Sequence, residues 1–351
     1  MNGSKAMGAT RRGVLAGGAV LAAGARAARA TPARFEPSGA LVDAARREGR
    51  VVMYTASFTE VEQETAAAFN KRFPFVKIEI IRASGGQLIT RVRTEAAAGK
   101  LVADVVDHSD RVLMKELEDL FAPYALPNAG DYLPESRISD RMWPRITLVW
   151  CIAYNTETTK VVPTSWMDLT KAGTYPPGSI GQVIAPSGGT TWTRIMFERQ
   201  MVEGGYWAAQ AATKPTLYPS SGPASDAVIR GEVQMAPVMR NVIFPKVRDG
   251  APVAMVFPSE GIPVTPYATG IPKTSVRQNA ARLFLDWCLS EEGQAWTMLE
   301  QGNMTSLKVL PVALPGFDAS ANRLWLPDNG QFAALRDSWT EEWNKIYGYR
   351  Q

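Results

Sequence analysis

The chain has 351 residues, of which 46% are hydrophobic and 21% charged, a globular composition long enough for two domains. Its formal net charge is +4, but five basic residues and no acidic residue lie within the first 30 positions. Without those five charges the remainder carries −1, so the composition gives no indication of a nucleic-acid partner. A single histidine excludes a histidine-rich zinc site.

The first 30 residues are typical of an export signal. Arg11 and Arg12 precede a Gly- and Ala-rich apolar stretch at 14–25, which is too short to span a bilayer core of about 30 Å. Residues 28–30 (Ala-Arg-Ala) then give the small-x-small pattern that signal peptidases cut. The paired arginines favour the twin-arginine route, with a general secretory signal as the alternative. We expect the mature protein to begin near Thr31 and to be soluble in the periplasm, without a lipid anchor.

Strands alternate with helices in the first half of the mature chain, which predicts α/β layers. The predicted strands cover residues 51–54, 76–81 and 103–106, and the predicted helices cover 60–72 and 87–98. The second strand is followed by Ser84, Gly85 and Gly86, and the third by His108 and Ser109.

The second half repeats this order. A strand at 180–186 is followed by Ser187-Gly188-Gly189 and a helix at 190–202, and a strand at 233–239 ends at Arg240. The segments 146–154, 252–257 and 264–270 are predicted to cross between two lobes, and helices at 275–289, 290–299 and 332–347 to complete the first lobe. We therefore expect residues 31–147 plus 262–351 to form the N-terminal lobe, and residues 148–261 to form the C-terminal lobe.

Eight short fragments along the mature chain follow a recognisable order. They are 48–52 (EGRVV), 103–105 (ADV), 143–144 (WP), 153–155 (AYN), 163–169 (PTSWMDL), 230–232 (RGE), 250–253 (GAPV) and 289–294 (LSEEGQ). Their order and spacing resemble family 1 extracellular solute-binding proteins of ABC transporters, in particular the ferric-iron-binding branch. The resemblance implies a type II periplasmic-binding fold, in which two doubly wound lobes joined by crossing strands hold a ligand in their cleft. It also implies a membrane permease as partner and a monomer without a cofactor.

One departure from the ferric-binding pattern concerns the ligand. Ferric binders carry adjacent tyrosines shortly after the Gly-Glu strand, whereas residues 239–244 contain Arg240 and no tyrosine. A guanidinium cannot ligate a metal, so the sequence favours a small anionic organic solute (carboxylate, phosphonate or phosphate ester) and no metal. Ferric iron or a ferric chelate remains the alternative, held by Tyr54, Tyr218, Tyr267 and His108.

The candidate ligand-binding residues follow the ends of predicted strands. Ser-Gly-Gly loops at helix starts offer backbone N–H groups and a positive helix end to an anion, and Arg240 could hold one bidentately. Alternatively, the loops are ordinary strand-to-helix turns, His108 is structural and Arg240 is a surface residue. The candidates are Ser57, Ser84, Gly85, Gly86, His108, Ser109, Ser187, Gly188, Gly189, Thr190, Thr191, Arg240 and Tyr267.

Catalytic motifs are missing from the sequence, and we expect no enzyme. The remote alternative is an exported hydrolase that uses Cys151 or Cys288 with His108. The two cysteines form either a disulfide, which an oxidising compartment permits, or two buried free thiols. A sensory role would leave the same marks in the sequence as transport.

Overall fold

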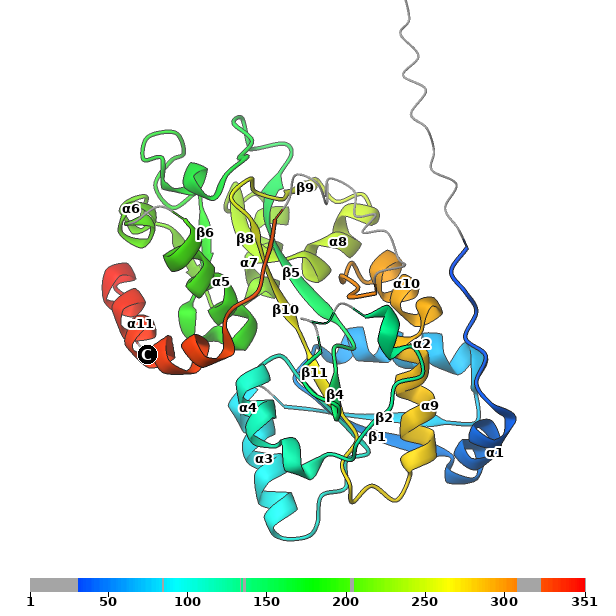
Figure 1. The fold of residues 1–351 in the computed structure, drawn as a ribbon. Helices are drawn as coiled ribbons and strands as arrows, with labels where there is room; N and C mark the ends of the chain where they lie inside the picture. Colours follow the sequence, from blue (N-terminus) through cyan, green and yellow to red (C-terminus); the bar gives the residue numbers. More distant parts are fainter. Residues whose placement is uncertain are drawn as a thin grey trace, which may run out of the picture. The chain divides into compact units, whose positions relative to one another are not determined.

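The computed structural model describes residues 31–83, 85–132, 134, 137–202, 205–307 and 323–350. The predicted export signal at 1–30 lies outside these ranges. Residues 32–351 form a single structural unit. Within the described ranges, two five-stranded β-sheets and a two-stranded one, with helices packed on them, make two lobes (Figure 1). Within the described ranges, no helix combines the length and the apolar character that crossing a membrane requires.

The first lobe is built on a five-stranded sheet. It comprises α1 (Gly39–Glu48), β1 (Arg50–Thr55), α2 (Thr59–Arg72), β2 (Lys77–Arg82), α3 (Gly85–Ala97), β3 (Val105–His108), α4 (Arg111–Glu116), β4 (Met142–Trp143), β11 (Ala268–Gly270), α9 (Gln278–Leu289) and α10 (Glu291–Glu300). The strand order is β2-β1-β3-β11-β4. β1 is parallel to β2 and β3, and parallel neighbours need long connections, which α2 and α3 supply.

Local sequence signals fix the helix ends near this sheet. The Ser38 hydroxyl accepts a hydrogen bond from Leu41 N at the start of α1, and Gly49 ends that helix with a φ of +69°. The Asp110 carboxylate accepts hydrogen bonds from the N–H groups of Val112 and Leu113 at the start of α4. This cap anchors the loop that follows β3 at the carboxyl end of the sheet.

The second lobe surrounds the long strand β5. It comprises β5 (Thr147–Asn155), β6 (Gly181–Val183), α5 (Gly189–Met201), α6 (Tyr206–Ala212), β7 (Thr216–Tyr218), α7 (Ser221–Ile229), β8 (Met235–Met239), α8 (Arg240–Arg248), β9 (Val253–Val256), β10 (Ile262–Pro266), β12 (Leu324–Trp325) and α11 (Asn329–Tyr347). β5 pairs antiparallel with β8, β9 and β10. β6 and β7 form a parallel pair, and Ile180 bridges to Met235 beside β8.

The chain passes between the two sheets twice. β4 belongs to the first sheet, and β5, which starts after residues 144–146, belongs to the second. The return runs through β10 in the second sheet, Tyr267, and β11 in the first sheet. This confirms the predicted fold of two doubly wound lobes joined by crossing strands. The segment 252–257 does not cross, because its strand β9 pairs with β5 inside the second sheet.

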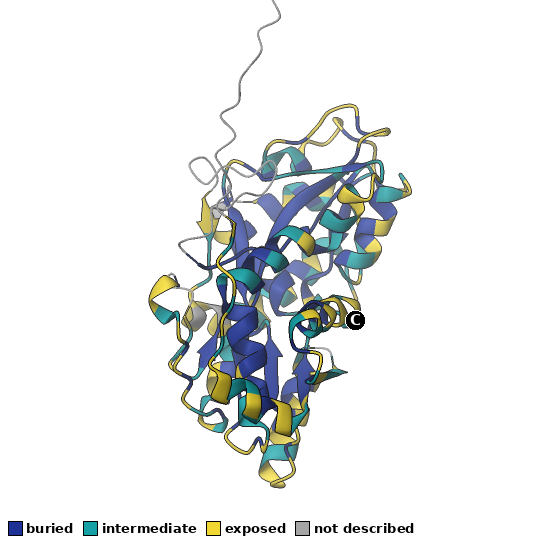
Figure 2. Cartoon of the chain, turned by 90° about the vertical axis from the view of Figure 1, so that its right-hand side faces the viewer, coloured by how far each residue is buried: buried dark blue, intermediate teal, exposed yellow. Residues whose placement is uncertain are grey.

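The C-terminal helix α11 differs from the sequence-based expectation. We expected it to complete the first lobe, but its aromatic side chains join the hydrophobic core of the second, where Trp343 is fully buried. Trp339 lies 6.3 Å, between ring centroids, from both Trp192 and Trp207. The exact lobe boundaries at 147/148 and 261/262 stay a prediction. Figure 2 shows the buried strands inside the molecule and the exposed outer faces of the helices.

Candidate functional site

A cavity of about 160 Å³ lies where loops from both lobes meet. The first lobe contributes residues that follow β1, end β2, start α3 and follow β3, and the second contributes the starts of α5 and α7. Open α/β sheets bind ligands at such strand ends. The lining residues are Ala56, Phe58, Arg82, Gly85, Ser109, Ser187, Gly188, Gly189, Thr190, Thr191, Ser220, Ser221, Met239 and Tyr267.

The cavity brings together eight of the predicted ligand-binding residues. Those from the second lobe form one continuous segment, and those from the first lobe and the return crossing come from three separate loops. The eight are Gly85, Ser109, Ser187, Gly188, Gly189, Thr190, Thr191 and Tyr267. The two lobes touch beside this group, since a Cβ at Gly189 would lie 3.4 Å from Asp110 Cβ and 3.5 Å from Ser109 Oγ.

Two helices start at the cavity without a side-chain cap. Gly188 precedes α5 and has a φ of +143°. Because glycine has no side chain, no capping hydrogen bond reaches the N–H groups of the first turn of α5. Ser220 precedes α7, and its side chain makes no capping hydrogen bond either. The free N–H groups and the positive ends of both helices are therefore available to an acceptor in the cavity.

Hydroxyl groups supply most of the remaining polar surface. Seven lining residues carry one, and they are Ser109, Ser187, Thr190, Thr191, Ser220, Ser221 and Tyr267. Ser109 and Tyr267 line the cavity together. Burial, with the nearby carboxylates of Asp107 and Glu62 adding to it, raises the pKa of Tyr267 above its usual value. Tyr267 therefore stays a neutral phenol that can donate a hydrogen bond.

His108 has a structural role beside the cavity. Its side chain is 1% exposed, and Nδ1 accepts a hydrogen bond from Asp110 N at 2.8 Å. Nε2 must then carry the proton, and it donates to the Gly85 carbonyl at 3.0 Å. Burial lowers the pKa of His108, which keeps the ring neutral. The histidine thus ties the loop after β2 to the loop after β3.

Two other predicted residues lie away from the cavity, and a third is not described. Ser57 is buried, and its backbone N–H donates to Thr55 Oγ1 at 3.0 Å. Gly86 lies in a solvent-open groove along α3 with Gln87. Ser84 lies outside the described residues.

Arg240 is buried just behind the cavity wall. Its neighbour Met239 lines the cavity, whereas the Arg240 guanidinium stacks over the Phe244 ring, 4.2 Å from the centroid. At 1% exposure it is not the surface residue considered as the alternative. Its Nε and Nη1 have no hydrogen-bond partner, and burial lowers its pKa to about 10. Its contact with a ligand stays a prediction.

Arg82 and Ser221 line the cavity although the sequence did not single them out. Arg82 ends β2 and pairs in register with Thr55 of β1. A usable signal was its position, because it comes two residues before the first Ser-Gly-Gly loop. Ser221 is the first residue of α7.

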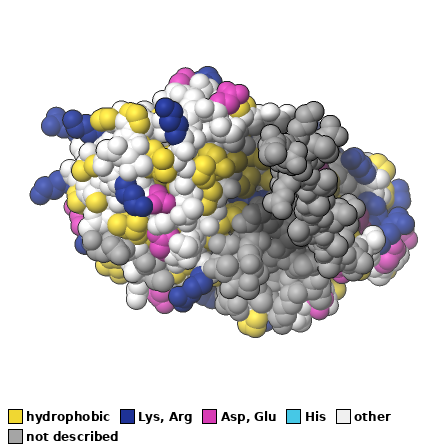
Figure 3. Space-filling model, turned by 90° about the horizontal axis from the view of Figure 1, so that it is seen from above, with side chains coloured by type: hydrophobic (Ala, Val, Ile, Leu, Met, Phe, Trp, Pro, Cys, Tyr) yellow, Lys and Arg dark blue, Asp and Glu magenta, His cyan; other side chains and the backbone are white. Residues whose placement is uncertain are grey.

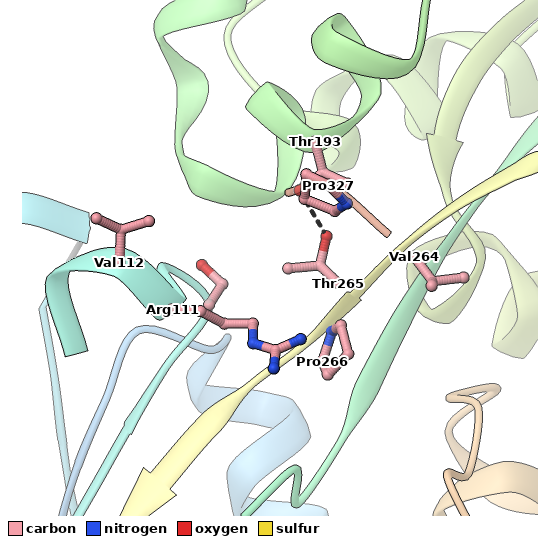
Figure 4. A pocket seen from close by; sticks show the side chains of 8 residues that line it. Arg111, Val112, Thr193, Val264, Thr265, Pro266 and Pro327 are labelled. Atoms are coloured by element: carbon pink, nitrogen blue, oxygen red, sulfur yellow. Dashed lines mark hydrogen bonds between the residues drawn. The ribbon is translucent and has the colours of Figure 1, made fainter. Parts of the chain in front are cut away.

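A second, much smaller pocket of about 10 Å³ lies between α4 and β10. In Figure 4, Arg111 extends from α4 toward Pro266, and Thr265 on β10 hydrogen-bonds Thr193 on α5. The pocket has room for about one water molecule, so the larger cavity is the candidate site.

The described residues offer little support for a metal centre or a cysteine nucleophile. Among them, no group of three His, Cys, Asp or Glu side chains could hold a metal ion. Cys151 and Cys288 are buried free thiols, the second of the two arrangements expected from the sequence. Burial raises the pKa of both to about 12, which disfavours the reactive thiolate.

Figure 3 shows charged side chains of both signs around the margin of one face, with hydrophobic side chains gathered nearer its middle. On that face, the described basic residues form no continuous stripe.

Known proteins share this fold and this arrangement of lobes. An uncharacterised protein of Haemophilus influenzae is 26% identical over 300 residues, which cover 77% of this chain and 81% of the relative. The fructose-6-phosphate-bound periplasmic binding protein AfuA from Actinobacillus pleuropneumoniae superposes with a TM-score of 0.70 at 22% identity, covering 86% of this chain and 100% of its own. Iron-bound HitA from Pseudomonas aeruginosa superposes with a TM-score of 0.67 at 20% identity, covering 84% and 99%.

At these identities the two solved structures establish the fold and leave the ligand open, since one holds a sugar phosphate and the other iron. The family model of bacterial extracellular solute-binding proteins matches residues 55–295, more than half of the chain. The chain therefore belongs to the bacterial extracellular solute-binding protein family.

Proposed function

We propose that the protein is the periplasmic solute-binding component of an ABC importer and captures a small anionic organic solute, a carboxylate, phosphonate or phosphate ester, in the cavity between its lobes. Proteins of this class bind small solutes and work with a membrane permease, which would be the partner here. The export signal at residues 1–30 belongs to the same proposal.

The composition of the cavity wall carries the proposal. Two uncapped helix starts and seven residues that carry a hydroxyl group line the cavity, and none of its described lining residues carries a carboxylate. Backbone N–H groups at helix starts stabilise negative charge, and hydroxyls donate to it. A cation or a ferric ion would need anionic ligands, and the one tyrosine among these lining residues has a raised pKa that opposes the phenolate.

The proposal can be tested by removing a single N–H group from the start of α5. Gly189 is the first residue of this helix, and proline is tolerated there because its missing N–H has no partner in the helix. Gly188 has a ψ of 178°, an extended value that is compatible with a following proline. Gly189→Pro should leave the unliganded melting temperature unchanged and weaken anion binding roughly tenfold or more.

Gly39→Pro is the matched control, because Gly39 is the first residue of α1 and has open space around its Cβ position. It should leave anion binding unchanged. Solution scattering with saturating anion should show a smaller radius of gyration, because the ligand shifts the open–closed equilibrium. If no carboxylate, phosphonate or phosphate ester stabilises the protein in a thermal-shift screen while ferric iron does, the proposal is wrong.

A further inference from the structure

Arg82 is the single charged side chain among the described residues that line the cavity. It is exposed, at the carboxyl end of β2. The acidic residue of the same strand, Glu79, pairs with Arg50 and Lys77 at the other end of the strand. No ion pair among the described residues involves Arg82, so its charge is available to a ligand.

The positive charge in the cavity is divided between the lobes. Arg82 contributes one full charge from the first lobe. The starts of α5 and α7 contribute about half a charge each from the second lobe. The sum is about two positive charges, and the described lining residues supply no anionic side chain to balance them.

The size of the cavity allows more than a bare ion. Its volume of about 160 Å³ is some sixteen times that of the pocket beside β10, which has room for about one water molecule. The cavity can therefore take an oxyanion group together with an organic substituent.

Building on the proposed function, we infer that Arg82 selects the charge of the solute, and that the site takes a compact oxyanion group with two negative charges, such as a phosphate monoester or a phosphonate. A monoanion would leave about one positive charge in the cavity unbalanced. Because Arg82 and the helix starts belong to different lobes, the dianion also links the lobes and favours the closed form.

Methyl phosphate and methyl sulfate test this inference, since they have nearly the same shape but different charge. At pH 7.5 methyl phosphate is mainly a dianion, because the second pKa of a phosphate monoester is about 6, and methyl sulfate is a monoanion. Isothermal titration calorimetry should give at least tenfold tighter binding of methyl phosphate to the wild type. This preference should shrink at pH 5, where methyl phosphate carries one charge.

Arg82→Gln should weaken methyl phosphate binding roughly tenfold to a hundredfold, the range for loss of a charge-assisted hydrogen bond, and methyl sulfate binding less. Arg82→Lys should restore part of the preference. Arg47→Gln, an exposed arginine on α1, removes the same net charge and should have no effect.

Equal binding of the two anions to the wild type, or unchanged binding by Arg82→Gln, would overturn the inference and leave the proposed anion-binding function standing. If neither anion binds the wild type at high millimolar concentration, the inference is wrong, and the thermal-shift screen of carboxylates against ferric iron decides the proposed function separately.

Discussion

Arg145 lies between β4 and β5, where the chain first passes from one lobe to the other. Its Nη2 donates to Glu62 Oε1 at 2.6 Å and to Asp107 Oδ2 at 2.7 Å, and its Nε donates to Asp107 Oδ1 at 3.3 Å. All three side chains are buried. Replacing Arg145 with methionine keeps the bulk of the side chain but leaves two buried carboxylates without a cation. Removing one partner of a buried ion pair costs roughly 3–5 kcal/mol of folding free energy.

The loss should depend on pH. Burial already raises the pKa of Glu62, and the Arg145 charge is the main opposing influence. In Arg145→Met that pKa rises further. Below its unfolded-state pKa of about 4.3, the Glu62 carboxyl is protonated in both states, so its raised pKa costs no folding free energy. Above that value the loss of folding free energy grows with pH until the pH reaches the folded-state pKa. Each pH unit in that interval costs about 1.4 kcal/mol for the Glu62 carboxyl group.

Urea unfolding followed by circular dichroism at pH 5 and pH 7 measures this loss. Arg93→Met is the control, because Arg93 pairs with Glu116 and both side chains are about half exposed, at 49% and 52%. The control should cost less than about 1 kcal/mol at either pH. A cost below about 1 kcal/mol for Arg145→Met, or an equal cost at the two pH values, would refute the reasoning.

Two further predictions concern the thiols and export. Because burial raises the pKa of Cys151 and Cys288 to about 12, the native protein should resist iodoacetamide at pH 8 and react fully in urea. Rapid labelling of the native protein would contradict the buried positions. Replacing Arg11 and Arg12 with lysine should leave the precursor in the cytoplasm on an immunoblot, since the twin-arginine route requires both. Normal export of this variant would point to the general secretory route.

The sequence predicted the residues that line the cavity best where they directly follow the ends of strands. The loops at Gly85 and at 187–189 each follow a strand and precede a helix, one in each lobe, and open α/β sheets bind ligands beyond the carboxyl ends of their strands. Residues so far apart in the sequence could therefore be placed together in advance. The crossing at 264–270 was predictable for a similar reason, since it is a strand long enough to serve both sheets.

Side-chain direction was the part that the sequence could not predict. Arg240 follows a strand end, as a cleft residue would, yet its guanidinium turns onto Phe244 within its own helix α8. His108 hydrogen-bonds the Gly85 carbonyl and the Asp110 N–H, and these bonds form only when the loops after β2 and β3 are folded against each other. Arg82 was overlooked because a charged strand end is typical of a solvated edge. The docking of α11 depends on which lobe presents Trp192 and Trp207 to Trp339, and amphipathic periodicity does not specify the partner.

Native mass spectrometry of the freshly purified mature protein tests the central claim most directly. The account predicts a mass excess equal to one small organic anion, lost on unfolding and reduced in Gly189→Pro but not in Gly39→Pro. A mass excess equal to iron, retained in both variants, would contradict it.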